Sequence, residues 1–238
     1  MEWIPTKLRP PLEVNELHLW RVYLSALETK VSQLRLLLSA EEQARSDRFI
    51  HPADGVKFVV GRAVLRLILA QYLGLEPGKI VIAIGEFGKP YVSKSININD
   101  LKFNLSHSGE LCLVAVSCGR EIGVDVERLR DDVAVEDLAT RYFSIEEIVE
   151  LQALPNALRR LGFFLCWTRK EAFVKAKSLG LQVPLDQFSV SLTPGQPAEI
   201  RGAEGAWTIM SLEPEPGYVA AVVSEGSIAS VKYCDYMG

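Results

Sequence analysis

Apolar and polar positions along the chain follow two different periods, which predict helices and strands. Apolar residues spaced three and four apart run from Phe58 to Tyr72 and again from Phe163 to Lys177. Both segments are predicted to be long amphipathic helices, each closed by a glycine after its last turn. Short runs rich in β-branched residues and bounded by turn residues predict strands at 80–84, 101–105, 111–117, 188–192, 207–212 and 219–223.

The same order of elements occurs in both halves of the chain. Ser39-x-x-Glu42 and Ser144-x-x-Glu147 are capping boxes that open a helix ahead of each long helix. Similar strings recur at nearly constant offsets: Ser39 and Ser144 lie 105 positions apart, Leu73-Gly74-Leu75 and Leu179-Gly180-Leu181 lie 106 apart, and the strand-end residues Ser117 and Ser224 lie 107 apart. Three matches in the same order indicate an internal duplication.

A duplicated order of helices and hairpins predicts an α+β fold with two lobes related by a pseudo-twofold axis. The lobes are expected to cover residues 1–120 and 121–238, with the connection near 119–123. Ligand sites tend to lie where two such units meet, so the active site is expected in the cleft between the lobes.

Composition changes this picture little. The 238 residues are 48% hydrophobic and carry a formal net charge of -4, which gives no reason to expect nucleic acid or an anionic membrane surface as a partner. Cys112, Cys118, Cys166 and Cys234 have no metal-binding spacing and are expected to be reduced, as in the cytoplasm. The most apolar stretch, 58–75, contains two arginines, and the first residues lack the pattern of a signal peptide, so a cytoplasmic protein without a membrane span is predicted.

Two carboxylates are predicted to project from one face of a strand. In Gly123-Val124-Asp125-Val126-Glu127 the acidic residues are two apart, and side chains two apart on a strand point the same way. Two like charges this close favour a hard divalent cation held by oxygen ligands. The alternative is an exposed face of an edge strand.

The second long helix carries an unusual pair of charges. Glu171 and Lys175 in the segment WTRKEAFVK are four apart and therefore lie on one helical face. An ordinary surface ion pair is the alternative, but the aromatic and apolar neighbours leave little of this helix for water, which favours a functional pair.

Polar and basic residues of the first half complete the candidate chemistry. The strand 101–105 ends in Ser106-His107-Ser108, where His107 can donate to a phosphate. Lys89 stands in a Gly-Lys-Pro turn, and Arg45 and Arg62 belong to a set of arginines whose guanidinium groups match phosphate oxygens. Taken singly, each arginine fits a surface or helix-packing role better than a functional one.

In this order, GKP, FNLSHS, GVDVE, FSIEE and WTRKEAFVK resemble the motifs of the 4′-phosphopantetheinyl transferase superfamily, in its surfactin-synthetase-activating (Sfp-like) class. The resemblance covers residues 38–181. It implies a pseudo-dimeric monomer that moves the phosphopantetheine arm of coenzyme A onto a serine of an apo acyl or peptidyl carrier protein and releases 3′,5′-ADP.

The resemblance also implies roles for individual residues. Asp125, Glu127 and Glu171 would hold Mg²⁺, and Lys175 would neutralise phosphate or protonate the leaving group. Ser106, His107, Lys89 and Arg45 match positions that contact the nucleotide or its phosphates, while Glu42-Gln43 replaces a second basic residue of some relatives. The base is Glu171 or water held by the metal. Glu147 matches an acidic residue of the family, with the capping box as its alternative role.

Two rival functions use the same residues. One is a coenzyme A or nucleotide binding module without transfer, which would not need three converging carboxylates. The other is a metal-dependent phosphohydrolase with water as the nucleophile. The sequence does not distinguish fatty-acid, polyketide and peptide carriers.

Overall fold

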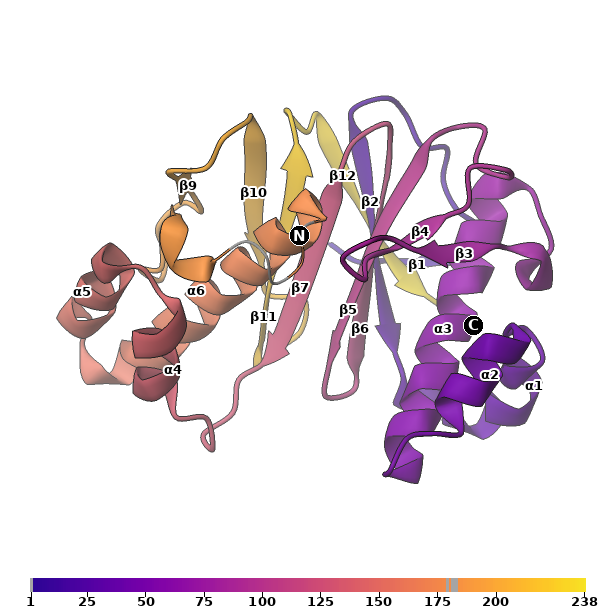
Figure 1. Cartoon of the computed structure of the whole chain (residues 1–238), viewed down its shortest axis with the longest axis horizontal. Helices are drawn as coiled ribbons and strands as arrows, with labels where there is room; N and C mark the ends of the chain where they lie inside the picture. Colours follow the sequence, from indigo (N-terminus) through magenta and orange to yellow (C-terminus); the bar gives the residue numbers. More distant parts are fainter. Residues whose placement is uncertain (1, 179, 181–183) are drawn as a thin grey trace.

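Two lobes of helices and strands lie side by side in the computed structural model, which describes residues 2–178, 180 and 184–238 (Figure 1). The helices are α1 (Val31–Arg35), α2 (Ala40–Ser46), α3 (Pro52–Leu73), α4 (Val135–Tyr142), α5 (Ile145–Ala153) and α6 (Asn156–Lys177). The longer strands are β2 (Glu16–Tyr23), β5 (Leu101–Ser108), β6 (Leu111–Cys118), β7 (Ile122–Arg128), β10 (Trp207–Leu212), β11 (Tyr218–Glu225) and β12 (Ser230–Tyr236). The short strands are β1 (Ile4–Thr6), β3 (Ile82–Ile84), β4 (Pro90–Val92), β8 (Ser189–Val190) and β9 (Ile200–Arg201).

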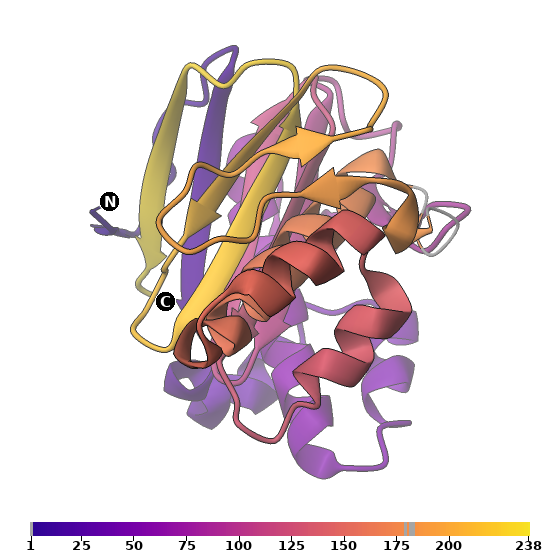
Figure 2. The same cartoon turned by 90° about the vertical axis from the view of Figure 1, so that its left-hand side faces the viewer.

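The two lobes have the same topology, which confirms the predicted duplicated α+β fold. One sheet has the order β1-β12-β2-β6-β5 and the other the order β10-β11-β7. In the first lobe β2 pairs with β6 and β6 with β5, and in the second lobe β7 pairs with β11 and β11 with β10, all antiparallel. In Figure 2 the helices of both lobes gather on one side of the strands.

Both capping boxes and both long helices are present, with one correction. Ser39 and Ser144 each accept from a backbone N–H while the glutamate three residues on bonds back. The long helices α3 and α6 each span 22 residues. Gly74 closes α3 with φ 64°, as predicted, but Ser178 and not a glycine takes the left-handed position after α6, with φ 59°. The Ser178 hydroxyl bonds to Glu121, a tertiary contact that local propensity does not contain. Of the repeated string Leu179-Gly180-Leu181, only Gly180 is among the described residues.

Two of the longer strands, β2 and β12, were not predicted, and neither were the short strands β1, β4 and β9. In β2 nearly every residue is buried, including Glu16 and His18, so its sequence lacks a clear alternation. Polar partners satisfy both side chains: His18 bonds to Tyr72 of α3 at 2.6 Å, and Glu16 pairs with the partly exposed Lys232 of β12 at 3.1 Å. The last strand, β12, lies between β1 and β2 in the first sheet. We propose that the boundary between the two lobes lies between residues 120 and 121. β12, at the C-terminal end of the second half, adds to the sheet of the first lobe.

An apolar core joins the lobes behind the cleft. Leu17 and Leu19 of β2 pack in one buried cluster with Val124 and Val126 of β7. Because these side chains are fully buried, burial of their apolar surface holds the first strands of the two lobes together. None of the helices in the described part of the chain combines the length and apolar character that a membrane crossing requires.

Candidate active site

The seam between the lobes is bridged by side chains. β5 and β7 pack side by side but belong to different sheets. Three polar residues of β5, each two positions from the next, reach across to β7. Val124 N donates to Asn104 Oδ1 at 2.9 Å, Ser106 Oγ donates to Asp125 Oδ1 at 2.8 Å, and Ser108 Oγ donates to Glu127 Oε2 at 2.7 Å. The seam therefore fixes both carboxylates of β7 from the first lobe.

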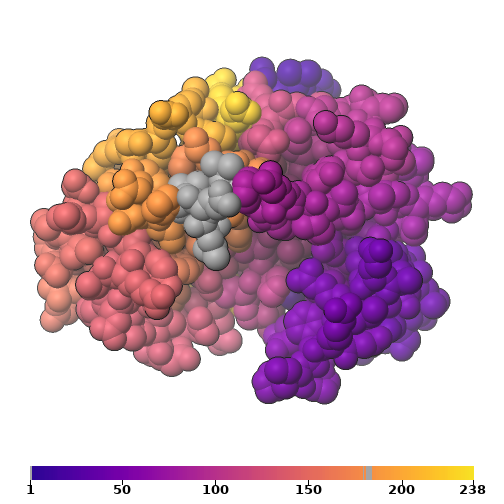
Figure 3. Space-filling model, viewed as in Figure 1, coloured from indigo at the N-terminus to yellow at the C-terminus, as the bar shows by residue number. Residues whose placement is uncertain are grey.

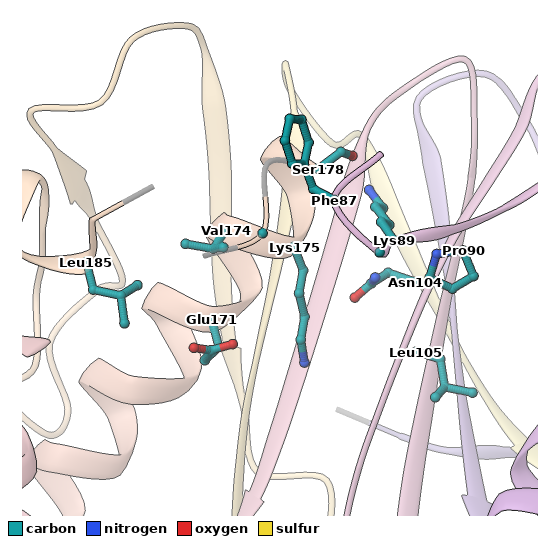
Figure 4. A pocket seen from close by; sticks show the side chains of 12 residues that line it. Phe87, Lys89, Pro90, Asn104, Leu105, Glu171, Val174, Lys175, Ser178 and Leu185 are labelled. Atoms are coloured by element: carbon teal, nitrogen blue, oxygen red, sulfur yellow. The ribbon is translucent and has the colours of Figure 1, made fainter. Parts of the chain in front are cut away.

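Helix α6 adds a third group from the other side. Lys175 Nζ donates to Asp125 Oδ1 at 2.6 Å and to Ser106 Oγ at 3.1 Å, so Lys175 and Ser106 meet at one carboxylate oxygen. Glu171 lies one turn earlier, on the side of α6 that faces the cleft, as Figure 4 shows. The approach of β7 to α6 depends on Gly123, where a Cβ would stand 2.0 Å from the carbonyl oxygen of Ala172.

Negative charge in this group is only partly compensated. Asp125 is 4% exposed, and its Oδ2 is buried without a hydrogen-bond partner among the described residues. Burial raises the pKa of Glu171, and the neighbouring charge of Asp125 raises it further. Burial also raises the pKa of Glu127, although the Ser108 hydroxyl opposes the shift. Ionisation of all three carboxyl groups therefore calls for a further cation.

The donor set fits Mg²⁺ in kind. Carboxylate and hydroxyl oxygens are the ligands that this hard cation prefers, and the unpartnered Asp125 Oδ2 is a free acceptor. In the arrangement of the described residues, no group of three or more His, Cys, Asp or Glu side chains is close enough to hold a metal ion. Lys175 neutralises Asp125 in this arrangement, and its ammonium would have to turn away for a metal to share that carboxylate.

The predicted nucleotide residues form a second group, on the first lobe. Arg45, Arg62 and His107 line one cavity of about 230 Å³ between α3 and β5. Arg62 Nη1 is buried and has no partner among the described residues, while the other side of its guanidinium group pairs with Glu42 at 3.4 Å. Partial desolvation and the charges of Lys175 and Lys57 lower the pKa of His107. This cavity is an electropositive pocket with an unused N–H donor.

Lys89 is close to the cleft but has other partners. A second cavity, of about 280 Å³, lies between the turn at 87–90 and α6 (Figure 4), and Lys89, Glu171 and Lys175 line it. Lys89 Nζ donates to Glu121 Oε2 and to the carbonyl of Ile122, both at 2.9 Å. In the space-filling view the surface is indented between the two lobes (Figure 3).

Glu147 does not belong to this group. It is 1% exposed, completes the capping box with Ser144, and pairs with the equally buried Lys170 at 2.8 Å. Its other oxygen accepts from Val190 N at 2.7 Å. The alternative role as capping-box partner is therefore correct, and Lys170 makes it a structural ion pair as well.

Sequence reasoning missed Ser108 and Glu121 as contributors. Ser108 follows Ser106 by two residues, the same spacing that separates Asp125 from Glu127, so the matched spacing of the two strands was an available signal. Glu121 stands just ahead of β7 in the segment that connects the lobes, and no local pattern marks it.

Comparison with known proteins identifies the family of the chain. Family models for the 4′-phosphopantetheinyl transferase superfamily and for the N-terminal part of a 4′-phosphopantetheinyl transferase match residues 121–223 and 23–119. The 4′-phosphopantetheinyl transferase HetI of a Nostoc species is 38% identical over 98% of both chains. The 4′-phosphopantetheinyl transferase Sfp of Bacillus subtilis is 32% identical over 78% of this chain and 81% of its own. A holo-(acyl-carrier-protein) synthase from Bacillus anthracis, solved in complex with CoA, aligns with 45% of this chain and 96% of its own at 18% identity and a TM-score of 0.39. With two lobes of one topology, a charged seam between them and a relative matched from end to end, the chain belongs to the 4′-phosphopantetheinyl transferase superfamily.

Proposed function

We propose that the seam between β5, β7 and α6 is where this transferase moves 4′-phosphopantetheine from coenzyme A to a serine of an apo carrier protein. The observation that carries the assignment is the meeting of Ser106 and Lys175 on Asp125 Oδ1, while Oδ2 has no hydrogen-bond partner among the described residues. Hydrogen-bond donors from one lobe and a cation from the other converge on a buried carboxylate. Such a site suits a pyrophosphate accompanied by a divalent cation.

The nucleotide end of coenzyme A is assigned to the pocket of Arg45, Arg62 and His107. Arginine forks match phosphate oxygens bidentately, and the buried Arg62 Nη1 has no other described acceptor. Lys89 is assigned to the neighbouring cavity, which the rest of the coenzyme A molecule can enter beside Glu171. The two cavities are adjacent, because Gly88, Pro90 and Leu105 line both.

Positioning and electrostatics account for most of the rate in phosphoryl-type transfer, and the residues of the seam supply both. Asp125, Glu127 and Glu171 would hold Mg²⁺, which when bound would offset charge on the pyrophosphate oxygens. With coenzyme A bound, the single O–H of Ser106 would turn from Asp125 to a phosphate oxygen, and Lys175 would steady the leaving 3′,5′-ADP. The raised pKa of Glu171 suits it as the base that takes the proton of the carrier serine.

Both halves of one chain contribute to this site, so we propose that the enzyme acts as a monomer. Its partners are coenzyme A and an apo acyl or peptidyl carrier protein. The cytoplasm is the proposed location.

Mass spectrometry of an apo-carrier tests the assignment. The protein is incubated with coenzyme A and MgCl₂, with and without carrier, and both the carrier mass and the nucleotide products are followed. The expected result is a carrier that gains the phosphopantetheine mass at its serine, with equimolar 3′,5′-ADP. Nucleotide release without carrier would contradict the proposal in favour of hydrolysis, and binding without turnover would contradict it in favour of a binding module.

A further inference from the structure

Glu121 connects three elements at the back of the cleft. It follows β6 and precedes β7, and its own carbonyl accepts from Glu225 N at 2.9 Å, which fixes its backbone on the second lobe. Its Oε2 accepts from Lys89 Nζ at 2.9 Å and from Ser178 Oγ at 3.2 Å, and its Oε1 lies 3.3 Å from Lys102 Nζ. One carboxylate thus bonds the 85–90 turn, β5 and the end of α6.

The groups that Glu121 joins are walls of the same cavity. Phe87 and Lys89 line the cavity of about 280 Å³ on the side of the first lobe, and Lys175 and Ser178 line it on the side of α6. The two walls are in contact beyond Ser178, where a Cβ on Gly180 would come within 3.0 Å of the Phe87 carbonyl oxygen. A shift of the turn relative to α6 would therefore change the width of the cavity.

Glu121 is also the acidic partner on which Lys89 depends. The Lys89 side chain is 14% exposed, and burial lowers its pKa while Glu121 opposes that shift. Lys102 pushes the pKa of Lys89 down further, but Lys102 has a second acid, Asp100, at 3.1 Å. Without Glu121 the Lys89 ammonium would face a neighbouring cation with no described acid to balance it. It would then lose its proton or leave the wall of the cavity.

We propose that Glu121 is a positioning residue for the binding of coenzyme A. Its carboxylate binds Lys89 and Ser178 at once and thereby holds the 85–90 turn against the end of α6. This inference rests on the proposed function, because it assigns the cavity to coenzyme A. Glu121 itself does not touch the reacting atoms. Its removal should therefore weaken the binding of coenzyme A without slowing the transfer step.

The test compares Glu121→Gln with Glu215→Gln. Glu215 is a matched control, because its side chain is 38% exposed against 35% for Glu121, and it too accepts from a basic side chain and a hydroxyl, those of Arg21 and Tyr23, away from the cleft. Calorimetry should show the Kd of Glu121→Gln for coenzyme A raised about tenfold, and KM should rise equally, with kcat at saturating coenzyme A within about twofold of wild type. Glu215→Gln should keep the wild-type Kd.

Two further variants separate positioning from loss of fold. Ser178→Gly removes one bond while keeping a residue suited to the left-handed position, and should raise Kd about twofold to threefold. In the double variant Glu121→Gln/Lys89→Met, Kd should be little higher than in Glu121→Gln alone, because both substitutions break the same Lys89–Glu121 pair. The inference would be overturned by an unchanged Kd for coenzyme A in Glu121→Gln or by an equal loss of affinity in Glu215→Gln. A fall in kcat of Glu121→Gln without a change in Kd would also overturn it. Absence of transfer by the wild-type enzyme would instead overturn the proposed function.

Discussion

Both lobes contain the same joint, a buried ion pair between the glutamate of the capping box and a cation of the long helix, and they differ in the strand beside it. In the first lobe the capping-box residue Glu42 binds Arg66 of α3 at 2.8 Å, and in the second Glu147 binds Lys170 of α6 at the same distance. Each cation also donates to two backbone carbonyls of the segment that follows its helix. The duplication has thus kept a buried ion pair that ties the short helix, the long helix and the next segment together.

The strands next to these joints carry different chemistry. Trp20 of β2 pairs with Val114 and packs in the core under α3, whereas Asp125 of β7 pairs with Ala221 and faces α6. Trp20 and Asp125 occupy corresponding positions, because each lies in the first strand of its lobe and pairs with the last strand of the hairpin that follows. The first lobe buries an indole where the second lobe buries a carboxylate. The strand beside the joint therefore contributes to the apolar core in the first lobe, and the corresponding strand of the second lobe contributes to a charged site.

Exchanging chemistry at this pair of positions should have the largest effect. Asp125→Asn keeps the size of the side chain but removes the charge that Lys175 and the proposed Mg²⁺ share, so kcat/KM should fall on the order of a thousandfold with little change in Tm. Trp20→Ala should instead lower the free energy of unfolding by about 3 to 5 kcal/mol, while the fraction that remains folded keeps its turnover. Steady-state kinetics and thermal melts on both variants check the contrast. Wild-type turnover in Asp125→Asn would remove this residue from the site.

The ion pairs of the two joints should differ in their contribution to stability. Glu147 and Lys170 are each 1% exposed, whereas Arg66 is 3% and Glu42 13% exposed, so the pair of the second lobe is the more completely shielded from water. We expect Glu147→Gln to reduce the free energy of unfolding by about 3 kcal/mol and Glu42→Gln by less. Urea unfolding of the two variants measures the difference. If Glu147→Gln unfolds like wild type yet loses turnover, Glu147 has a catalytic role and its structural assignment is wrong.

On α6, the two charges that face the cleft should act on different steps. Glu171→Gln removes the proposed base and should lower kcat on the order of a hundredfold, with a smaller loss of coenzyme A affinity. Lys175→Ala should lower turnover, and Lys175→Arg should restore only part of it, because a planar fork places its charge differently. Rapid-quench and steady-state kinetics with one apo-carrier compare the three. Equal turnover in Glu171→Gln and wild type would leave water or another group as the base.

Ser108 should have a smaller effect that depends on the cation. Its hydroxyl donates to Glu127 and also accepts from Arg128 N at 3.1 Å, so it fixes the direction of that carboxylate. Ser108→Ala should weaken Mg²⁺ binding about tenfold, and Ser108→Thr should recover most of it. Calorimetric titration with Mg²⁺ gives both constants. Ser117→Ala is the control, because the Ser117 hydroxyl of β6 donates to the Arg120 carbonyl in the turn before β7, and its removal should leave Mg²⁺ binding unchanged.

The sequence predicted those parts of the molecule that local patterns determine. The capping boxes, the two long helices, the hairpins and the face shared by Asp125 and Glu127 each follow from residues a few positions apart. What it did not predict depends on contacts between distant residues. β12 is held between β1 and β2 by pairing across the whole chain, and Ser178 takes the left-handed position beside Glu121. The residues that mark the end of a helix in the sequence do not indicate the contact between Ser178 and Glu121.

A double-mutant cycle between Ser106 and Lys175 tests most directly whether the two lobes share one site. Both side chains donate to Asp125 Oδ1, one from β5 of the first lobe and the other from α6 of the second. If they act on the same phosphate, the effects of Ser106→Ala and Lys175→Ala on kcat/KM should not multiply, and the cycle should show a coupling of about 1 kcal/mol or more. Effects that multiply to within about a factor of two would contradict a shared site.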